Sequence, residues 1–280
     1  AVVYRARDEQ QQRTVVLKLL RRDRPARERE RLLHEARLLA RVAHPSVVSV
    51  LGSGVHDGQP YLVLEDLFAI GLDEHLAATG PLPAPTIARI AISVARGLQA
   101  AHAAGVVHGD VKPANLLLYN PDGRVKVADF GLASDGDSLR PDGTATLRGT
   151  AAYMAPEHVV GRAPLDPRAD MYSLGVTLFE AAVGAPPFVR GTLLETMRAH
   201  LHDPVPPLAE RAPGLPLGLA QLIARLLRKR PDERFAAWGE VVDAAERILR
   251  DLESPIADAV SRAVSGDSGP NALKSLYGRS

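Results

Sequence analysis

Asp-Val-Lys-Pro-Ala-Asn at residues 110–115 is followed by Asp-Phe-Gly at 129–131 and by Ala-Pro-Glu at 155–157. The transfer of a phosphoryl group asks for little covalent chemistry from a protein. It requires a carboxylate that orients a hydroxyl, oxygen ligands for a metal ion, and cations around the phosphates. The three motifs supply these groups in one order along the chain, which predicts a phosphoryl-transfer site.

Each side chain of these motifs can take a separate role in the transfer. Asp110 can accept the proton of an incoming hydroxyl, and Lys112 can lie beside the transferred phosphate. Asn115 and Asp129 can ligate Mg²⁺, with Mn²⁺ as the alternative ion, because Mg²⁺ takes one or two protein oxygens together with phosphate oxygens. The carboxylates of Asp110 and Asp129 would repel each other at close range unless a cation neutralises them.

Composition narrows the classes of protein that remain. The 280 residues are 46% hydrophobic and 24% charged, as in an ordinary globular protein, and the net charge of +1 gives no strong field to attract nucleic acid. The absence of cysteine excludes disulfides, thiol catalysis and zinc–thiolate sites. The apolar run at 172–183 contains Glu180 and is too short to span a membrane. We therefore expect a cytoplasmic domain, with any membrane anchor outside these residues.

The pattern along residues 1–64 predicts a small lobe that is mostly β. Short runs of β-branched and aromatic residues are separated by polar segments, and Asp57-Gly58 is typical of a hairpin turn. Leu32, Ala36 and Leu39 recur at helical spacing before His44-Pro45. Strands are expected at 2–4, 14–18, 47–51 and 61–64, and a helix at 26–42.

Residues 69–253 predict a larger lobe that is mostly α. An apolar stripe from Ile87 to Ala101 indicates a helix with Gly105 at its C-terminal end. Apolar runs on either side of Asn-Pro-Asp-Gly at 120–123 indicate a hairpin. Further helices are expected at 169–183, 193–200, 217–227 and 238–252. Residues 254–280 are expected to form a tail or linker.

Taken together, the ordered motifs resemble those of the eukaryotic-like (Hanks-type) protein kinases, and among them the bacterial serine/threonine kinases, over about residues 1–250. The resemblance implies an α+β bilobal protein-kinase fold with a hinge between the lobes at 65–68. It also implies transfer of the γ-phosphate of Mg-ATP to Ser or Thr hydroxyls of protein substrates in bacterial signalling, with autophosphorylation through self-association. Lys112 at its position is typical of serine/threonine specificity.

Two other functions stay open at this point. A pseudokinase would bind ATP as a scaffold without turnover, and a small-molecule kinase of the same broad fold, such as an antibiotic phosphotransferase, would not act on proteins. The Ala-Pro-Glu motif at 155–157 and the helix that begins near Asp170 favour a protein substrate.

The resemblance implies a further cation and its partner in the small lobe. Val-Val-Leu-Lys at 15–18 matches the motif of the third kinase strand, where Lys18 would contact the phosphates of the nucleotide. Glu35 is expected to pair with Lys18 because an unpaired, half-buried cation is costly. Glu28 and Glu30 are the weaker alternatives for this pair.

The resemblance also implies a nucleotide pocket in which apolar side chains enclose the adenine and the backbone of the hinge supplies hydrogen bonds. Phe68-Ala69 replaces a more polar pair common after the hinge, so the ribose contact stays unassigned. The expected apolar walls are Val3, Val16, Leu64 and Leu117, and the expected hinge residues run from Glu65 to Leu67.

Gly109 departs from the family pattern, which has His-Arg-Asp where this chain has His-Gly-Asp at 108–110. That arginine binds a phosphorylated residue of the activation segment, and glycine cannot do so. Segment 132–148, rich in Asp, Gly, Ser and Thr, is expected to be a flexible activation segment. The candidate phosphorylation sites Ser138, Thr144 and Thr146 are therefore expected to matter less for activation.

Several residues are expected to serve the structure around the site. The resemblance implies that Asp170 binds backbone amides of the catalytic loop and that Arg234 pairs with Glu157. His108 is interpreted as a structural hydrogen-bonding residue, and Thr150 is expected to bond near Asp110.

The glycine-rich loop of the family is represented only by its end. Aligning Val3 and Lys18 with the family motifs puts Ala1 at the third glycine of that loop, and the chain has no initiator Met. The chain is either a fragment of a longer protein, which the absent Met favours, or a kinase whose N-terminus is truly degraded. We expect weak ATP binding in the chain as it stands, because the backbone amides of that loop normally cover the phosphates.

Overall fold

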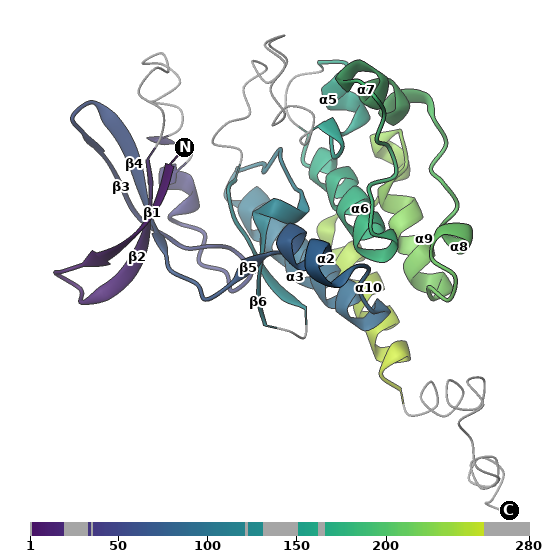
Figure 1. The fold of residues 1–280 in the computed structure, drawn as a ribbon, viewed down its shortest axis with the longest axis horizontal. Coiled ribbons are helices and arrows are strands. Elements are labelled where there is room, and N and C mark those ends of the chain that lie inside the picture. The colour runs from purple at the N-terminus through teal and green to yellow at the C-terminus, as the bar shows by residue number, and fades with distance from the viewer. Residues whose placement is uncertain are drawn as a thin grey trace, which may run out of the picture.

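The computed structural model describes residues 2–19, 33–34, 36–120, 123–130, 151–161 and 166–254. Figure 1 shows that these residues form a β-sheet region at the N-terminal end and a helical region at the C-terminal end. This arrangement agrees with the α+β bilobal fold expected from the order of the sequence motifs. Within the described ranges, no helix combines the length and the apolar character needed to cross a membrane.

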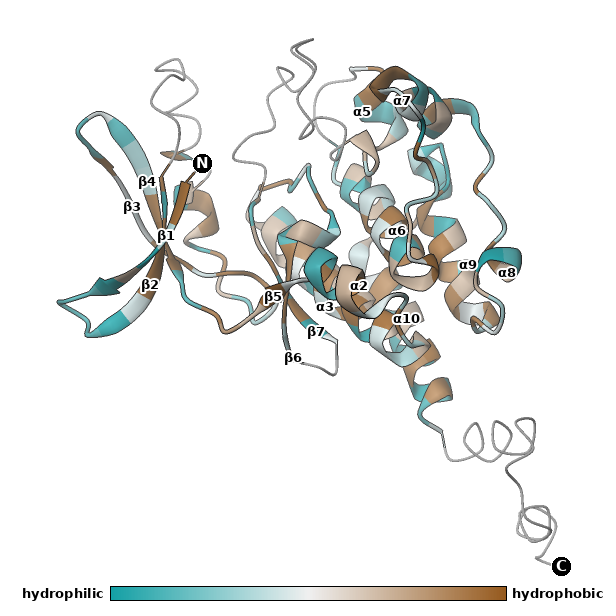
Figure 2. Cartoon of the chain, in the orientation of Figure 1, coloured by the Kyte–Doolittle hydropathy of each residue, from teal (hydrophilic) through white to brown (hydrophobic). Residues whose placement is uncertain are grey.

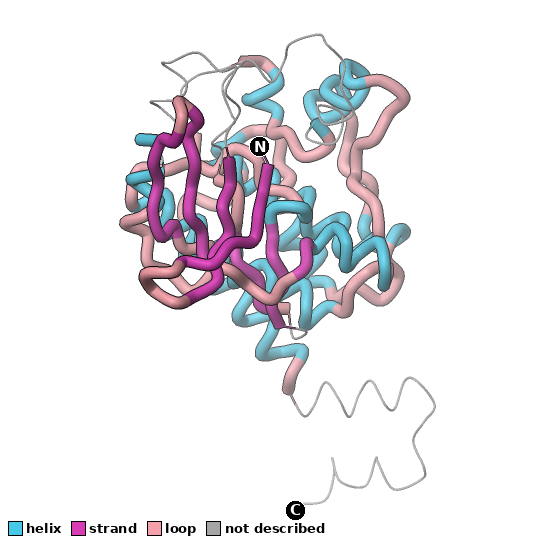
Figure 3. Tube along the Cα trace, turned by 60° about the vertical axis from the view of Figure 1, so that its left-hand side comes forward, coloured by secondary structure: helices cyan, strands magenta, loops and turns pink. Residues whose placement is uncertain are grey.

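The small lobe is an antiparallel sheet of four strands in the order β1-β2-β4-β3. The strands lie side by side in Figure 3. Their register pairs Val3 with Lys18, Val16 with Leu64, and Lys18 with Leu62. Because paired residues share a face of the sheet, one face collects side chains from three strands. This Lys18 face consists of Val3, Arg5, Val16, Lys18, Leu62 and Leu64. The strands are β1 (Val2–Asp8), β2 (Arg13–Leu19), β3 (Val50–His56) and β4 (Gln59–Glu65).

The turn between β3 and β4 follows the sequence prediction. Asp57 and Gly58 have φ angles of 49° and 73°, the left-handed region that a two-residue hairpin turn requires at both positions. Glycine enters this region without a steric penalty, and Asp tolerates it better than most residues.

The prediction of a strand at 47–51 is wrong in its position. Val47 forms only an isolated parallel bridge with Val127, and the strand begins at Val50. The backbone of residues 46–48 is occupied elsewhere, because Val127 N–H donates to Ser46 O at 2.8 Å and Val48 N–H donates to Val127 O at 2.9 Å. This segment therefore links the two lobes before β3 starts. Of the helix predicted at 26–42, residues 33–34 and 36–39 are helical, and 26–32 and 35 lie outside the described residues.

A second, smaller sheet lies in the larger lobe, with the order β5-β6-β7. It contains the predicted hairpin, whose Leu116 is paired with Val127, so that residues 115 and 128 meet at one end. Gly123, at φ 94°, lies at the other end. The strands are β5 (Ile70–Gly71), β6 (Leu116–Asn120) and β7 (Arg124–Val127).

The helices of the larger lobe surround α6, which is buried along almost its whole length. This explains why apolar residues of 172–183 fall on every side of the helix, and Figure 2 shows brown stretches mixed with white and teal ones on the helices of this lobe. α10 packs along α3. The helices are α2 (Leu72–Thr79), α3 (Ala84–Ala103), η1 (Pro113–Asn115), α5 (Pro156–Val159), α6 (Arg168–Val183), α7 (Leu193–His202), α8 (Leu208–Arg211), α9 (Leu217–Leu226), η3 (Pro231–Glu233) and α10 (Trp238–Leu252).

Candidate functional site

The loop at residues 106–115, called here the Asp110 loop, connects α3 to β6 and is anchored by a buried carboxylate. Asp170 of α6 accepts hydrogen bonds from His108 N–H at 2.9 Å and from Gly109 N–H at 2.8 Å. Burial opposes ionisation of Asp170, but its hydrogen bond with His102 and the charges and amide around it hold its pKa below the ordinary value. The prediction that Asp170 binds backbone amides of this loop is confirmed.

Gly109 adopts a backbone conformation that suits glycine. Its φ angle is 73°, in the left-handed region where a side chain costs roughly 1–2 kcal/mol. Glycine at this position lacks the cation of the arginine expected there from the resemblance. It also avoids the steric cost that a side chain would add directly before Asp110.

Asp110 presents its two carboxylate oxygens to different surroundings. Oδ2 accepts from Lys112 Nζ at 2.7 Å and from Asn115 Nδ2 at 3.1 Å. The same amide nitrogen donates to the main-chain oxygen of Asp110 at 2.7 Å. Oδ1 is buried and has no hydrogen-bond partner among the described residues. One oxygen is thus held in place, while the other can accept a hydrogen bond from an incoming group.

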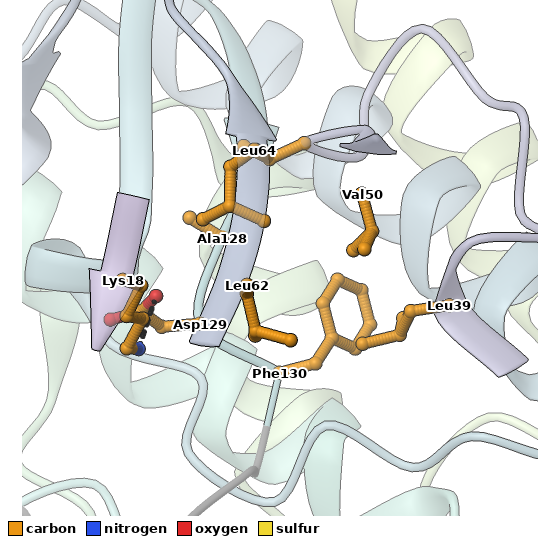
Figure 4. Close-up of a pocket in the computed structure, with 9 residues that line it drawn as sticks. Lys18, Leu39, Val50, Leu62, Leu64, Ala128, Asp129 and Phe130 are labelled. Carbon is orange, nitrogen blue, oxygen red and sulfur yellow. Dashed lines mark ion pairs between the residues drawn. The ribbon is translucent and has the colours of Figure 1, made fainter. Parts of the chain in front are cut away.

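Lys18 forms an ion pair with Asp129 in the described part of the chain. Its Nζ lies 2.7 Å from Asp129 Oδ1, and this ion pair is drawn in Figure 4. The expected partner, Glu35, lies outside the described residues. The Lys18 side chain is only 12% exposed, so an ion partner offsets much of the cost of its burial. Asp129 itself has a φ angle of 55°, an uncommon conformation for a residue with a side chain.

The backbone brings Asn115 and Asp129 to the same end of the β6–β7 hairpin. Ala128 N–H donates to Asn115 O at 2.9 Å, and His108 Nε2 lies 2.9 Å from Ala128 O. The His108 ring also packs against Phe130, with centroids 4.6 Å apart. The interpretation of His108 as a structural residue is confirmed by these contacts.

The same end of the hairpin offers the donor set that Mg²⁺ prefers. The Asn115 side chain directs its nitrogen to Asp110, which leaves its amide oxygen for another ligand, and the Asp129 side chain is 46% exposed. An amide oxygen and a carboxylate oxygen are hard ligands of the kind that Mg²⁺ and Mn²⁺ take. Lys112 and Lys18 already pair with Asp110 and Asp129, so lysines share the neutralisation of the two carboxylates that the sequence alone assigned to a metal.

A small apolar cavity of about 20 Å³ lies behind the Lys18–Asp129 pair. Figure 4 shows that its walls come from both lobes. Leu64 is the one predicted adenine-wall residue among those that line it. The sequence could have indicated Leu62, which lies two residues from Leu64 on the same strand face. Its lining consists of Lys18, Leu39, Val48, Val50, Leu62, Leu64, Ala128, Asp129 and Phe130.

The other expected wall residues lie apart from this cavity. Val3 and Val16 are on the Lys18 face, where Val16 is opposite Leu64 and Val3 is 58% exposed. Leu117 lies on β6, half-buried and paired with Lys126 of β7. Of the four residues expected to enclose the adenine, Val3, Val16 and Leu64 thus lie on the sheet of the small lobe and Leu117 on the sheet of the larger lobe.

Glu65, the first residue of the expected hinge, makes polar contacts that the sequence did not suggest. Glu65 Oε1 accepts from Lys126 Nζ at 2.6 Å and from Ser49 N–H at 2.7 Å. Burial works against the charged form of Glu65, but these bonds outweigh it and lower its pKa. Glu65 therefore joins the hinge to β7 through its side chain, in addition to the backbone role expected for it.

Residues 66–68 interact with β1. Arg5 pairs with Asp66 at 2.9 Å, and its guanidinium lies 5.5 Å from the centre of the Phe68 ring. Phe68 is 91% exposed, and Leu67 between them is half-buried. A cation over an aromatic ring is attracted to its face, so Arg5 holds the hinge segment against the sheet.

The predicted pair of Arg234 and Glu157 is confirmed. Arg234 donates from Nη1 to Glu157 Oε1 at 2.6 Å and from Nη2 to Oε2 at 2.8 Å, and its side chain is fully buried. Arg234 also donates to the main-chain oxygens of Arg168, Arg228 and Lys229. This network fixes α5 to the start of α6 and to the η3 region. The candidate phosphorylation sites Ser138, Thr144 and Thr146, like Thr150, lie outside the described residues.

Comparison with known proteins gives one consistent family. Residues 1–245 match the family model described as "Protein kinase domain". The serine/threonine-protein kinase PknH of Mycobacterium tuberculosis is 36% identical over 234 residues, which cover 84% of this chain and 37% of that kinase. PknE of the same organism is 34% identical over 262 residues, covering 93% of this chain and 46% of that kinase. The chain thus spans less than half the length of these two relatives.

Solved structures give the same result for the fold. The crystal structure of the M. tuberculosis PknI kinase domain has a TM-score of 0.69 at 30% sequence identity, covering 88% of this chain and 89% of that one. The structure of Rad53 in complex with AMP-PNP has a TM-score of 0.72 at 22% identity, covering 86% of this chain and 60% of that one, and this likeness concerns the fold alone.

Proposed function

The chain belongs to the protein kinase family, and from this premise we propose that it is a serine/threonine protein kinase that phosphorylates protein substrates, itself included, in bacterial signalling. Membership of the family implies ATP binding. The proposal adds the direction of the chemistry: the γ-phosphate of ATP passes to a Ser or Thr hydroxyl, and ADP leaves.

The observation that supports this activity most is that the two carboxylate oxygens of Asp110 have different surroundings. Oδ2 is held by Lys112 and Asn115, whereas Oδ1 is buried without a partner in the described part of the chain. An incoming hydroxyl can donate its hydrogen bond to Oδ1. Its oxygen then forms the new bond to the γ-phosphorus as the bond to the β–γ bridging oxygen breaks, and the proton passes to Asp110.

Two lysines are proposed to offset the negative charge of the reacting phosphates. Lys112 lies beside the reactive carboxylate, and Lys18 projects from the sheet face that would cover the nucleotide. In the structure Lys18 pairs with Asp129, so it would exchange this partner for phosphate oxygens when ATP binds. The pairing of Lys18 with Glu35 stays a prediction.

Asn115 and Asp129 are the proposed ligands of a Mg²⁺ ion, or of Mn²⁺ in its place. Their oxygens fit such an ion in chemical type, and the backbone bond between Ala128 and Asn115 brings the two residues to one place. When bound, the ion would bring positive charge to the β- and γ-phosphate oxygens.

The nucleotide contacts and the domain limits are part of the same proposal. The adenine would lie between the sheets, and the backbone of the hinge from Glu65 to Leu67 would bond to its edge. The proposed walls are Val3, Val16, Leu64 and Leu117. The proposed division is 1–64 for the small lobe, 65–68 for the hinge, 69–253 for the larger lobe and 254–280 for a tail or linker.

Transfer of labelled γ-phosphate to a general protein acceptor tests the proposal. We expect label on Ser and Thr in the acceptor and in the chain itself, and we expect Asp110→Asn to lower the rate about 10²–10⁴-fold, the usual contribution of a positioned acid or base. Asp243→Asn, which changes an exposed carboxylate on α10, is the matched control and should keep the normal rate.

Nucleotide binding, measured separately with a fluorescent ATP analogue, should be similar in the wild type and in Asp110→Asn. Transfer at the normal rate in Asp110→Asn would remove the role given to this residue. Binding of ATP without transfer to any acceptor by the wild type would instead favour a scaffold without turnover.

A further inference from the structure

A series of hydrogen bonds links α10 to the Asp110 loop. Trp238, the first residue of α10, donates from Nε1 to His102 Nδ1 at 2.7 Å. His102 Nε2 lies 2.8 Å from Asp170 Oδ2. Asp170 in turn accepts from the backbone N–H groups of His108 and Gly109. The series therefore ends directly before Asp110, although Trp238 and His102 are 136 residues apart in the sequence.

The chemistry of the groups gives this series one direction. The indole N–H can only donate, so His102 Nδ1 must accept. In a neutral imidazole the other nitrogen then carries the hydrogen, and Nε2–H donates to Asp170. Trp238 thus selects the tautomer of His102 that Asp170 needs.

Because these groups are buried, losing any one of their hydrogen bonds would cost free energy. Trp238 is 5% exposed, and the side chains of His102 and Asp170 are 10% and 1% exposed. Water cannot readily replace a bond that is lost here, so the group left behind bears the cost of being unsatisfied.

Trp238 is also held in a fixed place relative to His102. α10 lies along α3, the helix that carries His102, and ion pairs join the two helices, Arg89 with Glu253 and Arg96 with Glu246. The indole and imidazole rings are tilted, with centroids 5.6 Å apart. Because α10 is anchored in this way, Trp238 can fix the position of the His102 side chain, although His102 is 68 residues from Asp170 in the sequence.

We propose that Trp238 is a positioning residue for phosphoryl transfer. Through His102 and Asp170 it holds the backbone of His108 and Gly109, and with that backbone the reactive orientation of Asp110. Its kinetic consequence rests on the proposed function, whereas the restraint on the loop does not. Trp238 contacts His102 of α3 and is not among the residues that line the cavity beside Lys18, so it would influence the transfer step more than nucleotide binding.

A simpler role for Trp238 would be to fill the space between α3 and α10. Trp238→Phe separates the two roles, because it keeps an aromatic ring and removes the N–H. Glu246→Gln is the matched control, since it breaks a contact between the same two helices and leaves the series intact.

Hydrogen exchange followed by NMR is the first readout. In Trp238→Phe we expect the amides of His108 and Gly109 to exchange about tenfold faster, while the amides of α9 keep their rates, because a bond to a buried charged network is worth at least this factor. Glu246→Gln should leave the His108 and Gly109 rates unchanged. Equal rates at both amides in Trp238→Phe and the wild type, or equal acceleration by the two variants, would overturn the proposal.

Kinetics and a double variant give the second readout. For Trp238→Phe we expect kcat to fall about three- to tenfold with KM for ATP within about twofold, as for a group that acts on the transition state alone. Adding Trp238→Phe to His102→Gln should cause no further loss, because both changes break the same series. A purely additive loss, or a change in KM alone, would contradict a positioning role. If the wild type shows no transfer, the proposed function fails, but hydrogen exchange still decides whether Trp238 restrains the loop.

Discussion

The two sides of the candidate site are built in different ways. On the side of the larger lobe, buried polar groups each make several bonds: Asp170 holds the Asp110 loop, and Arg234 joins Glu157 of α5 to the start of α6. On the side of the small lobe, buried side chains such as Leu62 stand beside exposed ones, such as Val3 of β1 at 58% and Phe68, after β4, at 91%. Where buried charged groups are each held by several bonds, the geometry around them is set before any ligand arrives. On the side of the small lobe, exposed side chains can still change position when a nucleotide binds.

This difference predicts that single changes have unequal costs on the two sides. Removing one partner of a buried, multiply bonded group leaves an unsatisfied charge, whereas a half-exposed group can turn to water. Stability measurements on matched charge-removing variants can therefore break or sharpen the comparison.

The largest effect on stability is expected at the buried pair of Arg234 and Glu157 in the larger lobe. Arg234→Gln leaves the Glu157 carboxylate, 10% exposed, without its cation, and should lower the free energy of unfolding by about 3–5 kcal/mol. Urea unfolding followed by circular dichroism measures this change. Arg190→Gln is the control, because its pair with Asp203 is on the surface and should contribute about 0–1 kcal/mol. Equal effects of the two variants would contradict the special status given to the buried pair.

A smaller effect is expected at the hinge. Glu65 is partly exposed, so its bonds with Lys126 and Ser49 are screened by solvent, and Glu65→Gln should cost less than about 1 kcal/mol at neutral pH. The folded pKa of Glu65 lies below the ordinary value of 4.5. Its contribution is therefore present above pH 4.5 and is lost as the pH falls through the folded pKa.

The measurement is the difference in unfolding free energy between the wild type and Glu65→Gln at several pH values. It should shrink as the pH is lowered below the unfolded value. A difference that grows on acidification would mean that the bonds to Lys126 do not favour the charged carboxylate.

Much of the fold followed from local sequence. The turn at Asp57-Gly58, the hairpin before Asp129, and the long helices of the larger lobe were all indicated by spacing and turn residues. The short elements β5 and α2 were not, because two-residue pairing and an eight-residue helix leave little periodic pattern. The start of β3 was misplaced because a bridge between Val47 and Val127 depends on the other lobe.

A contact in the site was predictable where both of its residues belong to recognisable motifs. It was not predictable where one of them lies outside any motif. The pair of Arg234 and Glu157 was expected from motifs 77 residues apart. Nothing in the local sequence of Lys126 indicates its bond to Glu65, and Trp238 reads as an ordinary buried aromatic residue at the start of a helix. Such contacts are set by the packing of whole elements, which one sequence does not reveal.

The central claim is that Asn115 and Asp129 share a metal ion that orients ATP toward Asp110. A crystal structure with Mn²⁺ and a non-hydrolysable ATP analogue, with the ion located by its anomalous scattering, tests it most directly. We expect the ion to be bound by the Asn115 amide oxygen and an Asp129 carboxylate oxygen, with the γ-phosphate facing Asp110 Oδ1. An ion bound to the nucleotide alone, or Asn115 and Asp129 too far apart to share it, would contradict this account.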